Sequence, residues 1–136
     1  VSAVERLAQN LYISAPALSQ YAALAAFDAT AELDEKVAGY RRNRDLLLRE
    51  LPKAGFDKIA PVDGAFYMFA DVSGLTDNAQ EFCQKMLAEA GVATTPGIDF
   101  DPARGNRFLR FSIAGDFATM EEAARRLRLW SSDRRR

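Results

Sequence analysis

Arg110 is the residue of this 136-residue sequence whose type and position are best suited to chemistry. It lies in the middle of the apolar segment 108–113, and strand-like alternation places it on the face opposite Leu109 and Phe111. Arginine stays charged at physiological pH, and its planar guanidinium group can bind a carboxylate through two parallel hydrogen bonds. More often, an arginine lays its stem along apolar surface and turns its head to solvent, and spacing alone does not separate the two arrangements.

The sequence lacks histidine and contains one cysteine, Cys83, in a segment that we expect to be helical. Histidine is the most common metal ligand and the most common general base at neutral pH. A single cysteine forms neither a disulfide nor a thiolate metal cluster within the chain. The composition therefore excludes Ser-His and Cys-His catalysis, favours no metal site and fits a reducing compartment.

Charge and hydropathy argue against two classes of partner. The 18 basic and 19 acidic residues give a net charge of −1, so no overall field attracts nucleic acid or an anionic membrane. The basic run 134–136 is expected to be a solvated tail. No apolar run approaches the ~20 residues of a membrane span, and the N-terminus lacks the pattern of a signal peptide. We therefore expect a cytoplasmic protein.

The elements that position Arg110 follow from hydrophobic periodicity and turn residues. Apolar residues at helical spacing predict helices near 4–11, 17–27 and 30–51, a helix between 77 and Gly91, and a last helix from 119. β-favouring runs predict strands at 64–72, 92–95 and 108–113. The length suits a single domain, and the pattern is α/β or α+β, with helices packed on a small mixed sheet.

Local signals add detail to three of these helices. Ser14 is the expected cap of the alanine-rich helix 17–27, which we interpret as buried, and Thr30 is the expected cap of the next helix. The segments Asp77 to Gln80 and Thr119 to Glu122 resemble capping boxes at the starts of the last two helices. The arginines of helix 30–51 alternate with acidic residues, which favours a solvated face over a basic binding surface.

Three segments occur in an order that is typical of one known family. They are Gly-Ala-Phe-Tyr-Met-Phe at 64–69, Ala-Gly-Val-Ala-Thr-Thr-Pro-Gly-Ile-Asp-Phe at 90–100, and Arg-Phe-Leu-Arg-Phe-Ser-Ile-Ala at 107–114. In this succession the chain resembles the C-terminal small domain of class I/II aminotransferases, the fold type I enzymes related to aspartate aminotransferase. The resemblance spans nearly the whole chain, because 10–20 is similar to the segment where that family's chain leaves its large domain.

The resemblance implies roles for particular residues. Residues 1–136 would form the small domain, with 1–28 leading out of a large domain that is absent here. Arg110 matches the arginine of the family's Arg-x-Ser strand, which binds the α-carboxylate of the amino-acid substrate. The resemblance also suggests that four further residues border the site, although an ordinary turn and an ordinary core strand explain them equally well: Gly64, Phe66, Pro96 and Gly97. Tyr67 and Asp71 are interpreted as structural.

The same resemblance implies pyridoxal 5'-phosphate as the cofactor of a full-length parent. The family binds it through a lysine and an aspartate located upstream of this region, and none of Lys36, Lys53, Lys58 and Lys85 lies in matching surroundings. We therefore expect no catalytic and no cofactor-binding residue in this part, which alone should be inactive. The parent would transfer an amino group between an amino acid and a 2-oxo acid, within a homodimer, while the small domain closes over the site.

Two alternatives stay open at the level of sequence. The first is the small domain of a fold type I lyase or decarboxylating synthase, because a shared fold does not determine the reaction. The second is a free-standing noncatalytic α+β module that binds small acids or a protein partner. The helical pattern that begins at Val1 without a methionine favours an excised piece over such a module. The amino-donor side chain is not indicated.

Overall fold

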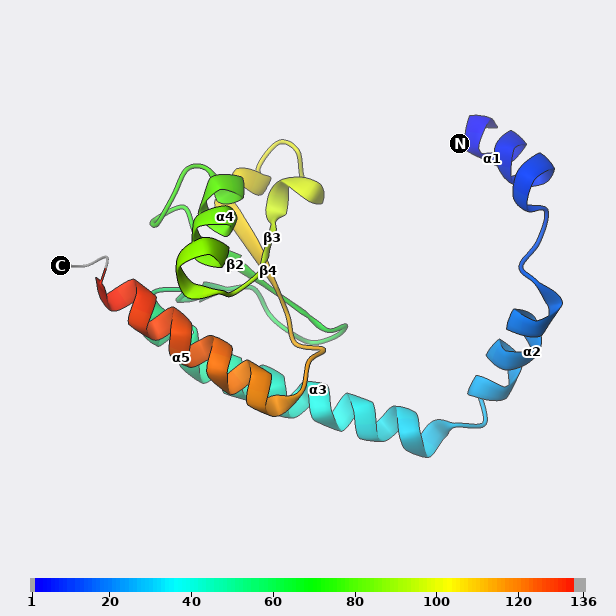
Figure 1. Cartoon of the computed structure of the whole chain (residues 1–136), viewed down its shortest axis with the longest axis horizontal. Coiled ribbons are helices and arrows are strands. Elements are labelled where there is room, and N and C mark those ends of the chain that lie inside the picture. The colour runs from blue at the N-terminus through cyan, green and yellow to red at the C-terminus, as the bar shows by residue number, and fades with distance from the viewer. Residues whose placement is uncertain (1, 134–136) are drawn as a thin grey trace. The chain divides into compact units, whose positions relative to one another are not determined.

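The computed structural model describes residues 2–133, so the predicted basic tail at 134–136 lies outside the described part. The chain divides into two compact units, 1–36 and 37–136 (Figure 1). Because helix α3 (Thr30–Glu50) crosses this boundary, its first turns belong to the first unit and the rest to the second.

The first unit contains helix α1 (Ser2–Leu7), a π-helical turn η1 (Ala8–Tyr12) and helix α2 (Ala17–Ala26). The prediction that α2 is buried is wrong, because Leu18 is 82% and Tyr21 74% exposed. Apolar composition shows that burial would be favourable, but it does not show that the covering surface belongs to the same unit. The cap predicted at Ser14 is also wrong: Pro16 occupies the N-cap position, without a side-chain hydrogen bond.

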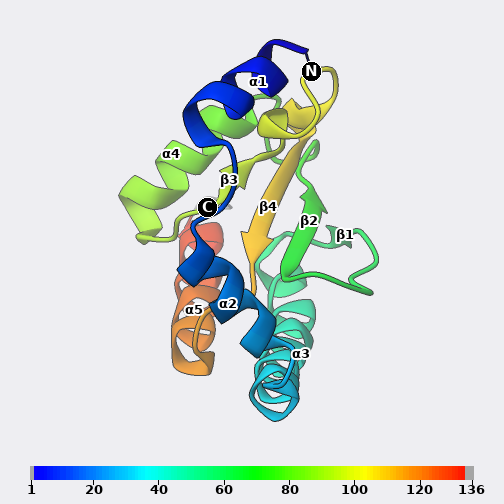
Figure 2. The same cartoon turned by 90° about the vertical axis from the view of Figure 1, so that its right-hand side faces the viewer.

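The second unit is built on a four-stranded sheet. Its strands are β1 (Lys58–Ile59), β2 (Tyr67–Asp71), β3 (Thr95–Pro96) and β4 (Phe108–Ser112), in the order β1-β2-β4-β3. Each of the three pairings is antiparallel, so the predicted mixed sheet is wrong. A helical crossover through α4 (Ala79–Ala90) does make β2 and β3 run in the same direction, but β4 lies between them (Figure 2).

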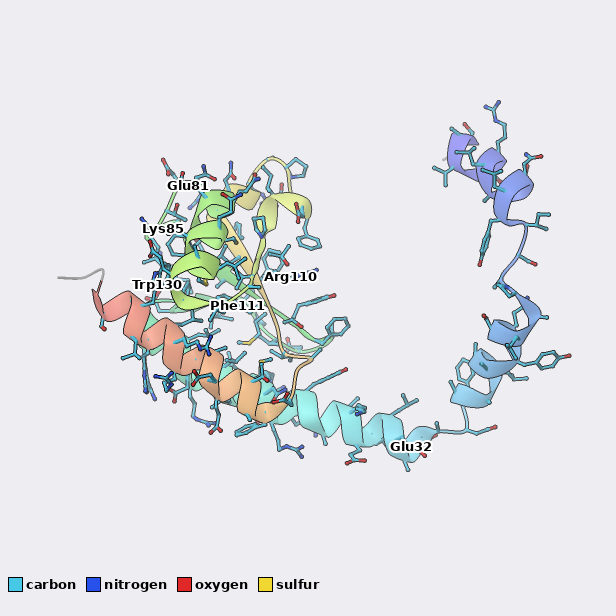
Figure 3. All side chains as sticks on the ribbon, viewed as in Figure 1. Glu32, Glu81, Lys85, Arg110, Phe111 and Trp130 are labelled. Atoms are coloured by element: carbon cyan, nitrogen blue, oxygen red, sulfur yellow. The ribbon has the colours of Figure 1, made fainter. Side chains whose placement is uncertain are left out.

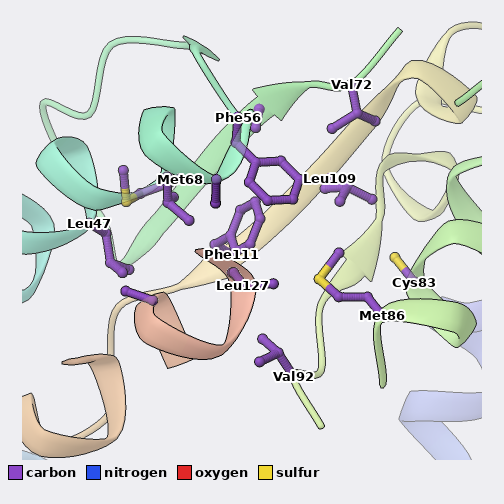
Figure 4. Close-up of a cluster of buried hydrophobic side chains, with 14 of the residues drawn as sticks. Leu47, Phe56, Met68, Val72, Cys83, Met86, Val92, Leu109, Phe111 and Leu127 are labelled. Atoms are coloured by element: carbon purple, nitrogen blue, oxygen red, sulfur yellow. The ribbon is translucent and has the colours of Figure 1, made fainter. Parts of the chain in front are cut away.

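Helices cover one face of this sheet. The second half of α3, helix α4 and helix α5 (Phe117–Asp133) supply apolar side chains to a single core with the buried residues of β2 and β4 (Figure 4). The core side chains with the least exposure come from α4, α5, β2 and β4 and from the residues that follow α3, β2 and β4: Leu51, Phe56, Met68, Val72, Met86, Leu109, Ile113 and Leu127. The architecture is therefore α+β, with helices in one layer and an antiparallel sheet in the other.

The predicted burial of the apolar stripe of α3 is confirmed for the second half of the helix and is wrong for the first half. Leu47 and Leu51 are buried as the apolar stripe predicts, but Leu33 and Val37 are 53% and 51% exposed. Thr30 is the first helical residue of α3 and not its cap. In α5 the predicted inward residues Leu127 and Trp130 are buried.

The helix starts differ from the predicted capping boxes by a few residues. Asn78 caps α4, and its side chain accepts a hydrogen bond from the backbone N–H of Glu81, so the box lies one residue later than predicted. Gly91 ends α4 with a φ of 66°, as expected of a left-handed glycine cap.

At α5 the cap is Asp116, which accepts hydrogen bonds from the backbone N–H and the hydroxyl of Thr119. The predicted partner Glu122 instead accepts from Arg125 and Arg126, and these hydrogen bonds lower its pKa to about 2. An acidic residue three positions before Thr119 competes successfully for the cap, because a carboxylate accepts the orphan N–H groups of a first turn.

Two structural absences concern residues 2–133. None of the helices formed there combines the length and apolarity needed to cross a membrane. The cysteine and the acidic side chains of residues 2–132 form no group of three that could hold a metal ion.

Candidate functional site

The sheet face opposite the helices carries Arg110 among aromatic side chains. Alternation turns Met68 and Leu109 into the core, where both have no exposed surface, and leaves Tyr67, Phe69 and Arg110 half-buried on the other face. Figure 3 shows Arg110 and Phe111 directed to opposite sides of β4. The predicted placement of Arg110 opposite the packing residues of its strand is thus confirmed.

Two aromatic rings and one hydroxyl surround the guanidinium group of Arg110. Its Cζ lies over the ring of Tyr67, 4.1 Å from the centroid, and over the ring of Phe100 at 4.6 Å. Its Nη2 donates a hydrogen bond to Oγ1 of Thr95 at 3.2 Å. Among residues 2–132, no side-chain carboxylate forms an ion pair with this cation. Most of its N–H donors are therefore available to a ligand.

Strand register brings these partners together. Thr95 is the cross-strand partner of Arg110 in the β3–β4 pair, and Pro96 is the partner of Leu109. Phe69 stands directly opposite Arg110 on β2, with Tyr67 two residues before it on the same face. Side chains that are opposite or diagonal on one sheet face lie within reach of each other.

Gly97 holds the loop that carries Phe100. It is buried, and a Cβ built at this position would lie 2.8 Å from the carbonyl oxygen of Gly105 and 2.8 Å from Cβ of Phe108. The loop is closed by the backbone N–H of Phe100, which donates to the carbonyl of Gly97 at 2.9 Å. Gly97 thus acts through close backbone packing at the start of the loop, and the other predicted site residue, Pro96, lies beside Thr95 in β3.

The predicted site residues Gly64 and Phe66 line a different hollow. This hollow has a volume of about 310 Å³ and also contacts Tyr40. Phe66 is 38% exposed and reaches Arg110 only indirectly, through the ring of Tyr67 at a centroid distance of 4.1 Å. A Cβ on Gly64 would meet nothing within 4 Å, and the left-handed residue is the next one, Ala65, with a φ of 57°. The structure therefore does not bring Gly64 to the guanidinium group.

Sequence reasoning missed Thr95 and Phe100 as partners of Arg110, and it interpreted Tyr67 as structural. Phe100 stands within the segment 90–100 that carries the resemblance, which was a usable signal. Thr95 lies in the same segment, but its contact with Arg110, 15 residues later in the sequence, depends on the register between β3 and β4, which local pattern does not give.

The comparison with known proteins bears on the whole chain. The family described as "Aminotransferase class I and II" matches residues 1–127. The chain belongs to this family. The predicted resemblance and the fold type are thereby confirmed, apart from the mixed pairing of the sheet corrected above.

Individual aminotransferases show how far the similarity extends. The valine–pyruvate aminotransferase of Mycobacterium tuberculosis is 52% identical over 130 residues, which are 94% of this chain and 34% of that protein. An aspartate aminotransferase of Sulfurisphaera tokodaii is 30% identical over 132 residues, which are 94% of this chain and 33% of that protein. A crystal structure of an aminotransferase from Mycobacterium tuberculosis superposes with a TM-score of 0.86 at 51% identity, covering 97% of this chain and 35% of that one. The chain thus spans about a third of the length of these relatives.

Proposed function

We propose that this chain is the part of a pyridoxal-phosphate-dependent aminotransferase that binds the α-carboxylate of amino-acid and 2-oxo-acid substrates, through Arg110. The observation that carries the proposal is a half-buried guanidinium group without a carboxylate partner in the described part of the chain, framed by two rings and one hydroxyl. A permanent cation that is partly removed from water is stabilised when an anion binds to it. A substrate carboxylate is such an anion.

The geometry of the group suits the reaction. A guanidinium edge binds the two oxygens of a planar carboxylate through parallel hydrogen bonds, which fixes the direction of the substrate as well as its position. In an amino-acid substrate this grip orients the amino group attached to the neighbouring carbon. Such positioning accelerates a reaction because the reacting groups no longer have to find their orientation.

The residues present do not fit the cofactor itself. Pyridoxal phosphate supplies the electron sink for amino-group transfer when it is bound to an enzyme. A lysine that binds it covalently needs a desolvated or cationic surrounding, whereas Lys36, Lys53, Lys58 and Lys85 are all exposed. Lys53 is in addition paired with Glu50 at 2.7 Å. The proposal therefore places the cofactor, and the chemical step, in the rest of the polypeptide.

The exposed apolar residues of the first unit support the corresponding division of domains. They are Val4, Leu7, Leu11, Tyr12, Ile13, Leu18, Tyr21, Leu24 and Phe27, each at least 59% exposed. A soluble protein rarely leaves so many large apolar side chains without a cover. We propose that 1–28 leads out of a large domain that covers them. A homodimer, which rests on the family alone, and a cytoplasmic location, which rests on the sequence pattern, belong to the same proposal.

The relatives bear on the alternatives. They are named as aminotransferases, which favours amino-group transfer over the lyase and synthase alternatives. Their names differ in the amino donor, valine in one and aspartate in the other, so the donor of this protein is left open.

The experiment replaces Arg110 by Ala in the longer polypeptide that contains these residues. Loss of a bidentate ionic contact in a desolvated site costs ~2 to 5 kcal/mol of transition-state stabilisation, which is roughly a thirtyfold to several thousandfold fall in kcat/KM for amino acids. A simple amine without an α-carboxylate should lose little activity. Arg107→Ala is the matched control, since Arg107 is an exposed arginine three residues earlier.

Equal losses for the amino acid and the amine would assign Arg110 a structural role and contradict the proposal. An unchanged kcat/KM in Arg110→Ala would contradict it as well. Circular dichroism of each variant verifies that the fold is intact, which we expect because the packing face of β4 is formed by Leu109 and Phe111.

A further inference from the structure

Two aromatic rings from separate elements lie against the cation of Arg110. Tyr67 comes from β2, and Phe100 comes from the loop that follows β3. The ring of Phe100 is itself held in place, because it meets the ring of Phe69 edge-on at a centroid distance of 5.9 Å and an angle of 79°. Although Phe100 is 53% exposed, its position over the guanidinium group is therefore supported by the sheet.

An aromatic partner differs from an acidic partner in what it leaves available. A ring face attracts a cation through its quadrupole and uses none of the cation's N–H donors. A carboxylate would neutralise the charge and occupy the edge of the guanidinium group. With its Cζ over the rings of Tyr67 and Phe100 and its Nη2 bonded to Thr95, Arg110 has N–H donors left for a ligand.

Restraint of the side chain has a further effect. A free arginine populates many rotamers, and ordering them on binding costs free energy that weakens the interaction. Rings that hold the guanidinium group before the ligand arrives remove part of this cost. The carboxylate then meets a group that already has the orientation of the bound state.

We propose that Tyr67 and Phe100 are positioning residues, which hold the guanidinium group of Arg110 edge-outward and thereby set the affinity for the substrate carboxylate. The inference rests on the proposed function of Arg110 and adds two residues to it. The ring of Tyr67 is the required feature, whereas its hydroxyl is not.

The test compares Tyr67→Leu, Phe100→Leu and Tyr67→Phe with Arg110→Ala in the longer polypeptide. Each leucine variant should raise the KM for an amino acid by about 3- to 30-fold, the range expected for loss of one cation–π contact, with kcat within about twofold. Both leucine variants should convert the amine without a carboxylate at the rate of the unsubstituted protein. Tyr67→Phe should keep the original KM. Phe108→Leu is the matched control, because the ring of Phe108 lies on the same sheet face and packs against Phe69 at a centroid distance of 6.1 Å.

The outcomes separate the two proposals. If Arg110→Ala lowers amino-acid turnover while both leucine variants keep the original KM, Arg110 binds the carboxylate without the help of the rings, and this inference is wrong. If the leucine variants lose amine and amino-acid turnover alike, the rings have a merely structural role, which also overturns it. If Arg110→Ala has no effect, the proposed function fails first.

Discussion

Asn43 shows at the scale of a single residue how the strand that carries Arg110 is held. It lies in α3 with 2% of its surface exposed. Its Nδ2 donates to the carbonyl oxygens of Ile113 at 2.9 Å and of Gly115 at 2.7 Å. These carbonyls lie where the chain leaves β4 and turns toward α5. One amide group therefore joins the helix layer to the end of the strand.

We predict that Asn43→Ala lowers the free energy of unfolding by about 1 to 3 kcal/mol, because two carbonyl groups would lose their donor within a buried site. Urea denaturation monitored by the fluorescence of Trp130, which is buried in the core, measures the change. Arg42→Ala is the control, since Arg42 precedes Asn43 in the same helix and is exposed. Equal stability of the two variants would show that water replaces the amide without cost.

Asn43 could not be found from the helical pattern. The apolar stripe of α3 passes through Tyr40, Leu47 and Leu51, and an asparagine beside it has the composition of a solvated position. The carbonyls that it binds are 70 and 72 residues away in the sequence. Local periodicity contains no information about partners at that separation.

At the scale of an element, the sequence and the structure assign the N-cap of α4 to different residues. The sequence suggests a capping box of Asp77 and Gln80, whereas the structure has Asn78 accepting from Glu81 N–H at 3.2 Å. We predict that Asn78→Ala costs about 1 kcal/mol of stability, the typical loss for an N-cap, and that Asp77→Ala changes stability by less than about 0.5 kcal/mol. Thermal or urea unfolding of the two variants decides between them. A larger loss of stability in Asp77→Ala than in Asn78→Ala would mean that Asp77 is the cap, as the sequence suggested.

The length of α4 affects the surroundings of Arg110. Helix α4 connects β2, which carries Tyr67, to β3, which carries Thr95, and Gly91 ends it with a positive φ. A helix that begins one residue later and ends at a fixed glycine sets the length of the crossover. The position of β3 beside β4 depends on this length, and so does the hydrogen bond from Arg110 to Thr95.

At the scale of the whole molecule, the two units differ in how they are stabilised. No described residue before position 37 is buried, while the second unit contains the whole core cluster. We predict that removal of residues 1–28 changes the free energy of unfolding of the remaining chain by no more than a surface substitution does, about 0.5 kcal/mol, as measured by urea denaturation. Trp130 fluorescence reports on that core.

The spectroscopic signature of the full chain follows from the same difference. Helices α1 and α2 contribute to the circular dichroism signal but supply no residue to the buried core. Part of that signal should therefore be lost at urea concentrations outside the cooperative transition that Trp130 fluorescence reports. The shortened chain should instead show coincident transitions by both methods. A large drop in its midpoint would mean that the first unit supports the second, contrary to the burial pattern.

The sequence by itself determined what depends on short distances along the chain. Alternation placed Arg110 opposite Leu109 and Phe111, glycine marked the end of α4, and the order of the segments at 64–69, 90–100 and 107–114 indicated the family. These features are local because a side chain's face repeats every two residues in a strand, and because a helix ends where its backbone can turn.

The tertiary structure alone decided which segments become neighbours. It inserted β4 between β2 and β3, and it set Tyr67, Thr95 and Phe100 around the charge of Arg110. The exposure of α2 was decided in the same way, because burial requires a covering surface that the apolar composition of a helix does not specify. Strand order and register result from the packing of the whole core, in which each pairing competes with others of similar local pattern.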